Sequence, residues 1–241
     1  MATSSWVICA SSHARLRLFC FPHAGGGASL YRQWSELLPE GVDICPLYLP
    51  GRENRLSEPC FRRLAPLVEA LAEALSPYMN VPFAFFGHSM GALISFELAR
   101  YLRKKQRPGP QHLFVAAYRA PQLPDRYAPL HDLSDGKLIE MLSRFRGTPQ
   151  AVLQHTELIK VFLPMLRADF ELCETYIYLQ EPPLSCPISV FGGEKDTLIT
   201  TRELQAWNMQ TRHTFKLNML PGDHFFLNEQ RELLLKSLSS E

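Results

Sequence analysis

Residues 82–105, PFAFFGHSMGALISFELARYLRKK, determine the fold of this chain. The apolar run 82–86 has the length of a short buried strand, and 90–105 has the spacing of a helix. Between them, Gly87-His88-Ser89-Met90-Gly91 is the pattern of a nucleophilic serine on a tight strand-to-helix turn. Glycines avoid clashes in such a turn, and the helix N-terminus favours developing negative charge near the serine. The strand and helix on either side disfavour the alternative, a structural serine in a glycine-rich turn.

Strand and helix patterns alternate on both sides of this turn. Short apolar runs predict further strands at 16–21, 42–48, 113–118, 187–191 and 214–219. Helical spacing predicts helices at 29–38, 64–75, 201–209 and 228–238. Strands that alternate with helices favour a mainly parallel central sheet with helices on both faces. We therefore expect an α/β fold.

The alternation breaks at residues 122–183. Helical patterns occupy 133–145 and 151–178, and this stretch contains no convincing strand. We interpret it as a helical lid inserted above the sheet. The chain length suits one sizeable core, so a single domain over residues 1–241 is expected.

A serine nucleophile needs a base, and in a fold with this turn the chain order is serine, acid, histidine. Of the eight histidines, only His213 and His224 follow the insertion. His213 precedes the last expected strand, which places it at the wrong edge of the sheet. His224 follows that strand, at the carboxyl edge where ligands bind. Ser89 is therefore predicted to be the nucleophile and His224 its base, although a lone loop histidine is more often a solvated residue.

An orienting carboxylate should lie between these two residues in the sequence. Asp196 is the favoured candidate because it lies just after the penultimate strand. Glu194 competes locally, and Asp196 also fits an ordinary turn residue. Asp223 is a further competitor, but as the immediate neighbour of His224 its side chain should point elsewhere.

The negative oxygen that forms on an acyl substrate needs two backbone donors. The N–H group of Met90, the residue after the nucleophile, is expected to be one of them. The other is expected in the turn 21–26, FPHAGG, and Ala24 is favoured because a small residue lets the backbone approach the substrate. His23 in the same turn fits either a polar wall of the site or an ordinary loop residue.

Composition argues against several other classes of protein. The formal net charge is +1, so no strong field for nucleic acid or an anionic membrane is expected. No apolar stretch is long enough to span a bilayer, and residues 1–15 lack a secretory pattern, so a cytoplasmic location is expected. The six cysteines show no metal-binding pattern and are expected to be reduced thiols. With no phosphate-binding Gly-Lys motif either, neither a metal nor a cofactor is expected.

A set of segments, in this order, carries a resemblance to a known family: 21–26 (FPHAGG), 49–52 (LPGR), 87–91 (GHSMG), 166–169 (LRAD) and 222–226 (GDHFF). Over nearly the whole chain the sequence resembles the type II thioesterases. These are stand-alone editing enzymes of nonribosomal peptide and polyketide synthesis, related to the medium-chain acyl thioesterases of fatty acid synthase. The resemblance implies an α/β-hydrolase fold and a helical lid that shapes the acyl pocket. It also implies hydrolysis of misprimed or stalled acyl groups on the phosphopantetheine arms of acyl or peptidyl carrier proteins.

Two further expectations concern the insertion, which breaks the strand-helix alternation, and the surface that a carrier protein would contact. The lid should be mobile and should line an acyl tunnel with apolar residues, although a plain helical cap fits nearly as well; the candidate lining residues are Phe145, Phe162, Leu163, Met165 and Phe170. The resemblance also implies acidic carrier proteins and thus a basic docking surface. Arginines in and after the loop that follows the second strand are candidates, although each fits a solvated surface charge as well: Arg52, Arg55, Arg62 and Arg63.

Other functions remain compatible with these residues. A general serine esterase or lipase, or a medium-chain acyl thioesterase, would share every catalytic residue and differ only in substrate. A non-catalytic module on the same fold is disfavoured, because the serine, aspartate and histidine are all present in the expected order.

Overall fold

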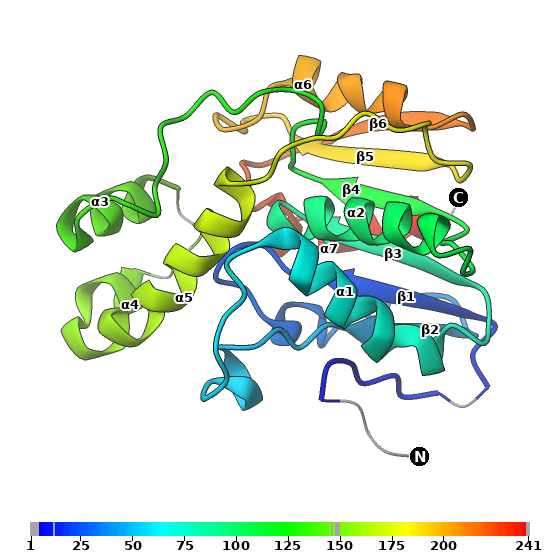
Figure 1. Ribbon diagram of the computed structural model, residues 1–241, viewed down its shortest axis with the longest axis horizontal. Coiled ribbons are helices and arrows are strands. Elements are labelled where there is room, and N and C mark those ends of the chain that lie inside the picture. Colours follow the sequence, from blue (N-terminus) through cyan, green and yellow to red (C-terminus); the bar gives the residue numbers. More distant parts are fainter. Residues whose placement is uncertain (1–4, 12, 146, 148–149, 240–241) are drawn as a thin grey trace.

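The computed structural model describes residues 5–11, 13–145, 147 and 150–239, and it is built around one sheet (Figure 1). The sheet has the strand order β2-β1-β3-β4-β5-β6, and each neighbouring pair is parallel. The strands are β1 (Leu16–Phe21), β2 (Val42–Pro46), β3 (Phe83–His88), β4 (Leu113–Ala116), β5 (Ile188–Gly193) and β6 (Phe215–Leu220). Each begins and ends within two residues of the predicted run, which confirms the α/β fold with a mainly parallel sheet.

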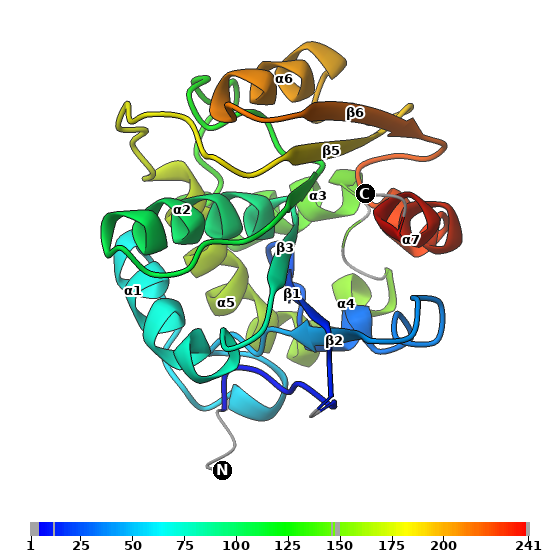
Figure 2. The same cartoon turned by 90° about the vertical axis from the view of Figure 1, so that its right-hand side faces the viewer.

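Helices lie on both faces of this sheet (Figure 2). Helices α1 and α2 lie on one side of the sheet, and α7 lies on the other. The α-helices are α1 (Leu64–Leu75), α2 (Met90–Lys104), α3 (Asp135–Phe145), α4 (Gln150–Gln154), α5 (Thr156–Glu174), α6 (Thr201–Gln205) and α7 (Arg231–Ser239).

Alternate residues of the strands supply the two faces of the sheet. Phe19 and Phe85 are buried in the core on the α1 and α2 side. Leu18, Cys20 and Phe86 are buried in the core on the α7 side. Successive side chains of a strand point to opposite faces, so a sheet covered on both faces needs strands that are apolar throughout. This is why β3, β4 and β5 could be predicted from nearly continuous apolar runs, whereas β1, β2 and β6 also carry the charged residues Arg17, Asp43 and Lys216.

The helix predicted at 29–38 does not form. Only a 3-10 turn, Ala28–Tyr31, is present, followed by further turns. The Tyr31 and Trp34 rings are buried edge-to-face at 4.9 Å, and Trp34 packs on Phe86 at 4.8 Å. The Tyr31 hydroxyl donates a hydrogen bond to the Phe21 carbonyl at 2.8 Å. Two buried aromatic rings three residues apart imitate one face of a helix in the sequence pattern, and here tertiary packing holds an irregular backbone.

Helices α3, α4 and α5 form the insertion between β4 and β5, and they extend beyond one end of the sheet (Figure 1). The long pattern at 151–178 is two helices, α4 and α5, and α5 ends at Glu174 and contains Pro164. The insertion has a small apolar core of its own, made by Leu138, Leu142, Ile159, Leu163, Met165 and Leu166. It is therefore a packed substructure rather than a loose loop.

The N-terminal segment corrects one expectation about the cysteines. Cys9 and Cys45 form a disulfide, with Cα atoms 4.7 Å apart, that ties this segment to β2. The expectation of six reduced thiols was wrong for this pair, because a sequence separation of 36 residues with no motif gives no sign that the chain brings the two together. Asp43 lies within 4.8 Å of both sulfur atoms, but its carboxylate accepts the N–H groups of Ala10 and Ser11. Within the described residues, no helix has the length and apolar character to cross a membrane.

Candidate active site

Ser89 lies on the turn between β3 and α2 with a backbone conformation of φ 52° and ψ −117°. A Cβ atom at Gly87 would lie 2.2 Å from the Gly91 carbonyl oxygen, and one at Gly91 would lie 2.1 Å from the Phe21 carbonyl oxygen. Neither approach is sterically possible, so both glycines are required. The Ser89 N–H group donates to the Ala116 carbonyl of β4 at 2.8 Å, which holds the strained turn in place.

The three residues predicted from chain order lie together at the carboxyl edge of the sheet. The Ser89 Oγ atom lies 3.1 Å from Nε2 of His224, and Nδ1 of His224 lies 2.9 Å from Oδ2 of Asp196. The side chains of His224 and Asp196 are 9% and 1% exposed. This is the arrangement of a nucleophile, a base and a carboxylate that orients the base.

Asp196 is held in place by the loop that follows β5. Its Oδ1 atom accepts the N–H groups of Leu198 at 2.7 Å and Ile199 at 3.1 Å, which leaves Oδ2 facing His224. The competitor Asp223 instead accepts the Phe225 N–H at 2.9 Å. The Asp223 carboxylate thus serves its own turn, as its position next to His224 led us to expect.

Two further histidines, His23 and His88, pack beside His224. Their rings are buried with centroids 5.1 Å apart, and Nε2 of His88 donates to the His224 carbonyl at 2.9 Å. Burial, with help from the nearby His224, lowers the pKa of His23 to about 4 even though its hydrogen bond to the Ala24 carbonyl acts in the opposite direction. Burial, together with the two neighbouring histidines, lowers the pKa of His88 well below its ordinary value. Both rings are therefore neutral near pH 7.

His88 is a site residue that sequence reasoning missed. Its bond to the His224 backbone ties the end of β3 to the loop that carries the base. A histidine at the end of an otherwise apolar strand was the available signal, because a buried polar side chain needs a specific partner.

Ser89 lines a cavity of about 390 Å³, and residues of α3 and α5 in the insertion form part of its wall. The backbone candidates Met90 and Ala24 line it together with Ser89 and His224. Among the hydrogen bonds of the described residues, none is donated by the Ala24 N–H group. That donor is free for a substrate oxygen.

The cavity wall confirms part of the predicted lining. Phe145 of α3 and Phe170 of α5 do line it, and most of the remaining wall is apolar. Leu163 and Met165 instead belong to the insertion's own core, and Phe162 packs against that core, so these three were wrong. Helical spacing alone does not show which side of an inserted helix faces the site.

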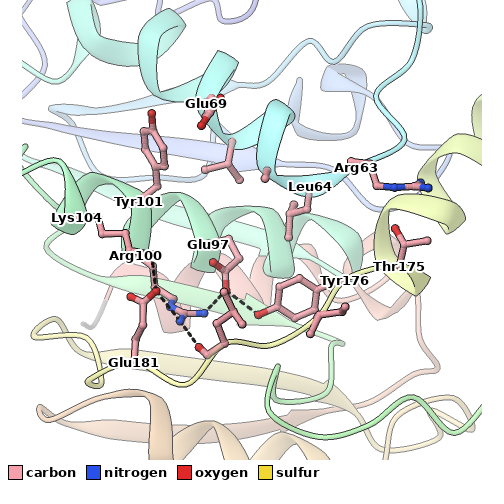
Figure 3. Close-up of a pocket in the computed structure, with 14 residues that line it drawn as sticks. Arg63, Leu64, Glu69, Glu97, Arg100, Tyr101, Lys104, Thr175, Tyr176 and Glu181 are labelled. Atoms are coloured by element: carbon pink, nitrogen blue, oxygen red, sulfur yellow. Dashed lines mark hydrogen bonds and ion pairs between the residues drawn. The ribbon is translucent and has the colours of Figure 1, made fainter.

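A second cavity, of about 340 Å³, lies between α1, α2 and the segment after α5 (Figure 3). Several of its charged groups are paired: Glu97 accepts from Arg100 and from the Tyr176 hydroxyl, and Glu181 lies 3.0 Å from Arg100. Ser89, Asp196 and His224 lie elsewhere. This cavity is therefore not the candidate active site.

The structure corrects the predicted docking arginines. Arg52 and Arg55 are 6% and 5% exposed and are paired inside the protein, so they cannot form a docking surface. Arg62 and Arg63 are exposed, but both bind the carboxylate of Glu171 on α5. An arginine in a polar loop is usually solvated, and the sequence did not show that these arginines have carboxylate partners.

Comparisons with known proteins agree with this geometry. Residues 16–241 match the family described as thioesterase domain. The gramicidin S biosynthesis protein GrsT of Aneurinibacillus migulanus is 46% identical over 240 residues, which cover 99% of this chain and 94% of that protein.

Two solved structures are similar throughout. The RedJ thioesterase of the prodiginine pathway in Streptomyces coelicolor is 42% identical, with a TM-score of 0.90 over 94% of this chain and 90% of RedJ. The type II thioesterase BorB from the borrelidin biosynthetic cluster is 33% identical, with a TM-score of 0.90 over 100% of this chain and 98% of BorB. The turn at Ser89, the α/β-hydrolase fold and these matches lead to one conclusion: the chain belongs to the thioesterase-domain family and is a thioester hydrolase.

Proposed function

We propose that this enzyme removes acyl groups from the phosphopantetheine arms of acyl or peptidyl carrier proteins, as an editing step in nonribosomal peptide or polyketide synthesis. The observation that carries the proposal is the hydrogen-bonded chain from Ser89 through His224 to Asp196, at the mouth of a largely apolar cavity of about 390 Å³. The similarity to GrsT, RedJ and BorB, which are named for gramicidin S, prodiginine and borrelidin biosynthesis, supports the choice of substrate.

In the proposed first step, the Ser89 hydroxyl attacks the thioester carbonyl and passes its proton to Nε2 of His224. The Nδ1–H group of His224 donates to Asp196, which holds the ring in the tautomer whose Nε2 can accept a proton. The carbonyl oxygen becomes negative and binds the N–H groups of Met90 and Ala24. When the intermediate collapses, His224 returns the proton to the departing thiol, and the acyl group stays on Ser89 as an ester.

In the second step a water molecule attacks that ester and gives its proton to His224. The same two N–H groups bind the oxygen, the Ser89–acyl bond breaks, and the proton returns to Ser89 Oγ. The products are a carboxylic acid and free enzyme, so no cofactor is needed. The neutral His23 and His88 rings add no positive charge beside His224.

The test compares three substrates with the same acyl group: the acyl carrier protein, the acyl N-acetylcysteamine thioester and a matched oxygen ester. We expect kcat/KM to be highest for the carrier-bound group, by about tenfold or more over the small thioester, because the protein adds its own binding contacts. Equal kcat/KM for carrier and small thioester would show a general thioesterase. A preference for the oxygen ester would show an esterase or lipase.

Three expectations from the sequence remain part of this proposal. The chain forms a single domain over residues 1–241, the insertion at 122–183 is a mobile lid over the cavity, and the enzyme works in the cytoplasm. The insertion's position over the cavity supports the second of these.

A further inference from the structure

A buried ion pair links the insertion to the turn that carries Ala24. Asp169 lies on α5 and Arg52 lies in the loop after β2, 117 residues away in sequence, and they are 3% and 6% exposed. The guanidinium binds both carboxylate oxygens, with NH2 to Oδ1 at 2.7 Å and NH1 to Oδ2 at 2.8 Å. This two-point geometry fixes the orientation of both side chains.

Both members of the pair also bind the turn. Oδ2 of Asp169 accepts the Gly25 N–H at 2.8 Å, and NH1 of Arg52 donates to the Gly26 carbonyl at 3.0 Å. Nδ1 of His23 donates to the Ala24 carbonyl at 2.9 Å. The peptide group between Ala24 and Gly25 is therefore held at both of its polar atoms, by Asp169 on one side and by His23 on the other.

The peptide group between His23 and Ala24 is held only at its oxygen, because the His23 backbone carbonyl accepts the Gly26 N–H at 2.9 Å. The N–H group of that same peptide, which belongs to Ala24, donates no hydrogen bond within the described part of the chain. Ala24 lines the cavity together with Ser89. These contacts thus hold the peptide groups on both sides of Ala24 and leave its N–H group free.

We propose that Arg52 and Asp169 are positioning residues for the reaction: they hold the Ala24 N–H group where the negative oxygen of the transition state forms. The pair touches neither Ser89 nor His224 and acts through the turn. Because Asp169 belongs to α5, the pair also joins the insertion to the site that stabilises the oxygen. Such donors act on the transition state more than on bound substrate, so the pair should affect kcat and leave KM largely unchanged.

The experiment uses the small acyl N-acetylcysteamine thioester and two variants. Asp169→Asn keeps the shape of the side chain but has a single acceptor oxygen for Arg52 and Gly25. The double variant Arg52→Met/Asp169→Leu removes both charges together, so no unpaired charge is left buried. Deleting one donor of this kind costs about 10²–10³ in kcat, so misplacing one should lower kcat by about tenfold to a hundredfold.

Two further measurements separate positioning from plain structural support. A trifluoromethyl ketone with the same acyl chain adds to Ser89 and forms a negative oxygen, so its affinity should fall by the same factor as kcat. Rates are divided by the folded fraction from circular dichroism. Arg55→Met is the matched control, because Arg55 is an equally buried arginine of the same loop that binds Glu58 and the Tyr48 carbonyl rather than the turn. It should lower the melting temperature and keep kcat within about twofold.

Unchanged kcat and inhibitor affinity in the folded Asp169 variants would overturn the proposal, as would a rise in KM alone. The inference rests on Ser89 chemistry but not on the carrier protein as substrate. If the wild type itself fails to turn over the small thioester, the proposed function is at fault. If the wild type and the variants turn it over equally, only the role of the ion pair is wrong.

Discussion

Replacing Asp196 with asparagine tests the candidate site at a single atom. In the wild type, Oδ1 accepts the N–H groups of Leu198 and Ile199, and Oδ2 accepts Nδ1–H of His224. An asparagine must turn its oxygen toward the two backbone donors, so its NH₂ group faces Nδ1 of His224. Nδ1 then has to accept, the ring proton moves to Nε2, and Nε2 can no longer take the proton of Ser89.

The same change of tautomer lowers kcat by about 10⁴ in a well-studied serine protease, and we expect a loss of that order here. A factor of 10⁴ corresponds to about 5.5 kcal/mol of transition-state stabilisation. Thiol release from the acyl N-acetylcysteamine thioester measures it. Asp223→Asn is the matched control and should stay within about threefold, since an amide oxygen can still accept the Phe225 N–H. If Asp196→Asn keeps more than about a tenth of the activity, or if Asp223→Asn is the more damaging change, the assignment of the carboxylate is wrong.

Three further predictions address the nucleophile, the insertion and the response to pH. Ser89→Ala should lower kcat by several orders of magnitude without unfolding the chain, and a fluorophosphonate probe should label the wild type alone; equal labelling of both would refute the nucleophile. If 122–183 is a mobile lid, its amides should exchange hydrogen faster than those of the sheet, whereas uniform protection would indicate a fixed cap. His23 has its pKa lowered to about 4 in the folded state, so its contribution to stability is complete above pH 6.5 and is lost as the pH falls toward 4. His23 should account for about 3 kcal/mol of the stability that urea unfolding shows to be lost over this range, and His23→Gln should remove that part; an identical pH dependence in that variant would contradict a neutral, buried His23.

The sequence was sufficient for the parts of the site that depend on local geometry and chain order. The turn at Ser89 has a five-residue pattern because two close backbone contacts exclude side chains at Gly87 and Gly91. Asp196 follows the buried strand β5 and His224 follows the edge strand β6, and parallel strands bring their carboxyl ends to one edge. Each of these inferences needed only neighbouring residues and the order of strands.

Contacts between distant segments could not be predicted in this way. Arg52 is a charged residue in a loop, and its burial depends on Asp169, which lies inside a helix whose orientation the sequence pattern did not determine. The disulfide between Cys9 and Cys45 likewise depends on where an irregular N-terminal segment crosses β2. Pairings of this kind depend on tertiary packing, which apolar periodicity does not specify.

Pro164 divides α5 into two parts that are under different constraints. Beyond it, Asp169 holds the turn at Gly25 and Glu171 binds Arg62 and Arg63, so this part is anchored to the rest of the protein at several points. Before it, Ile159 and Leu163 pack with Leu138 and Leu142 of α3 in the insertion's own core. Proline lacks the N–H group that would bond to the preceding turn, so the helix is weakest at this position. Beyond Pro164, Leu166 and Phe170 of α5 line the acyl cavity, and Met141, Leu142 and Phe145 of α3 line it from the insertion. The size of the cavity can therefore be altered through α3 while the oxygen-binding turn stays in place, which separates the choice of substrate from the rate of the chemical step.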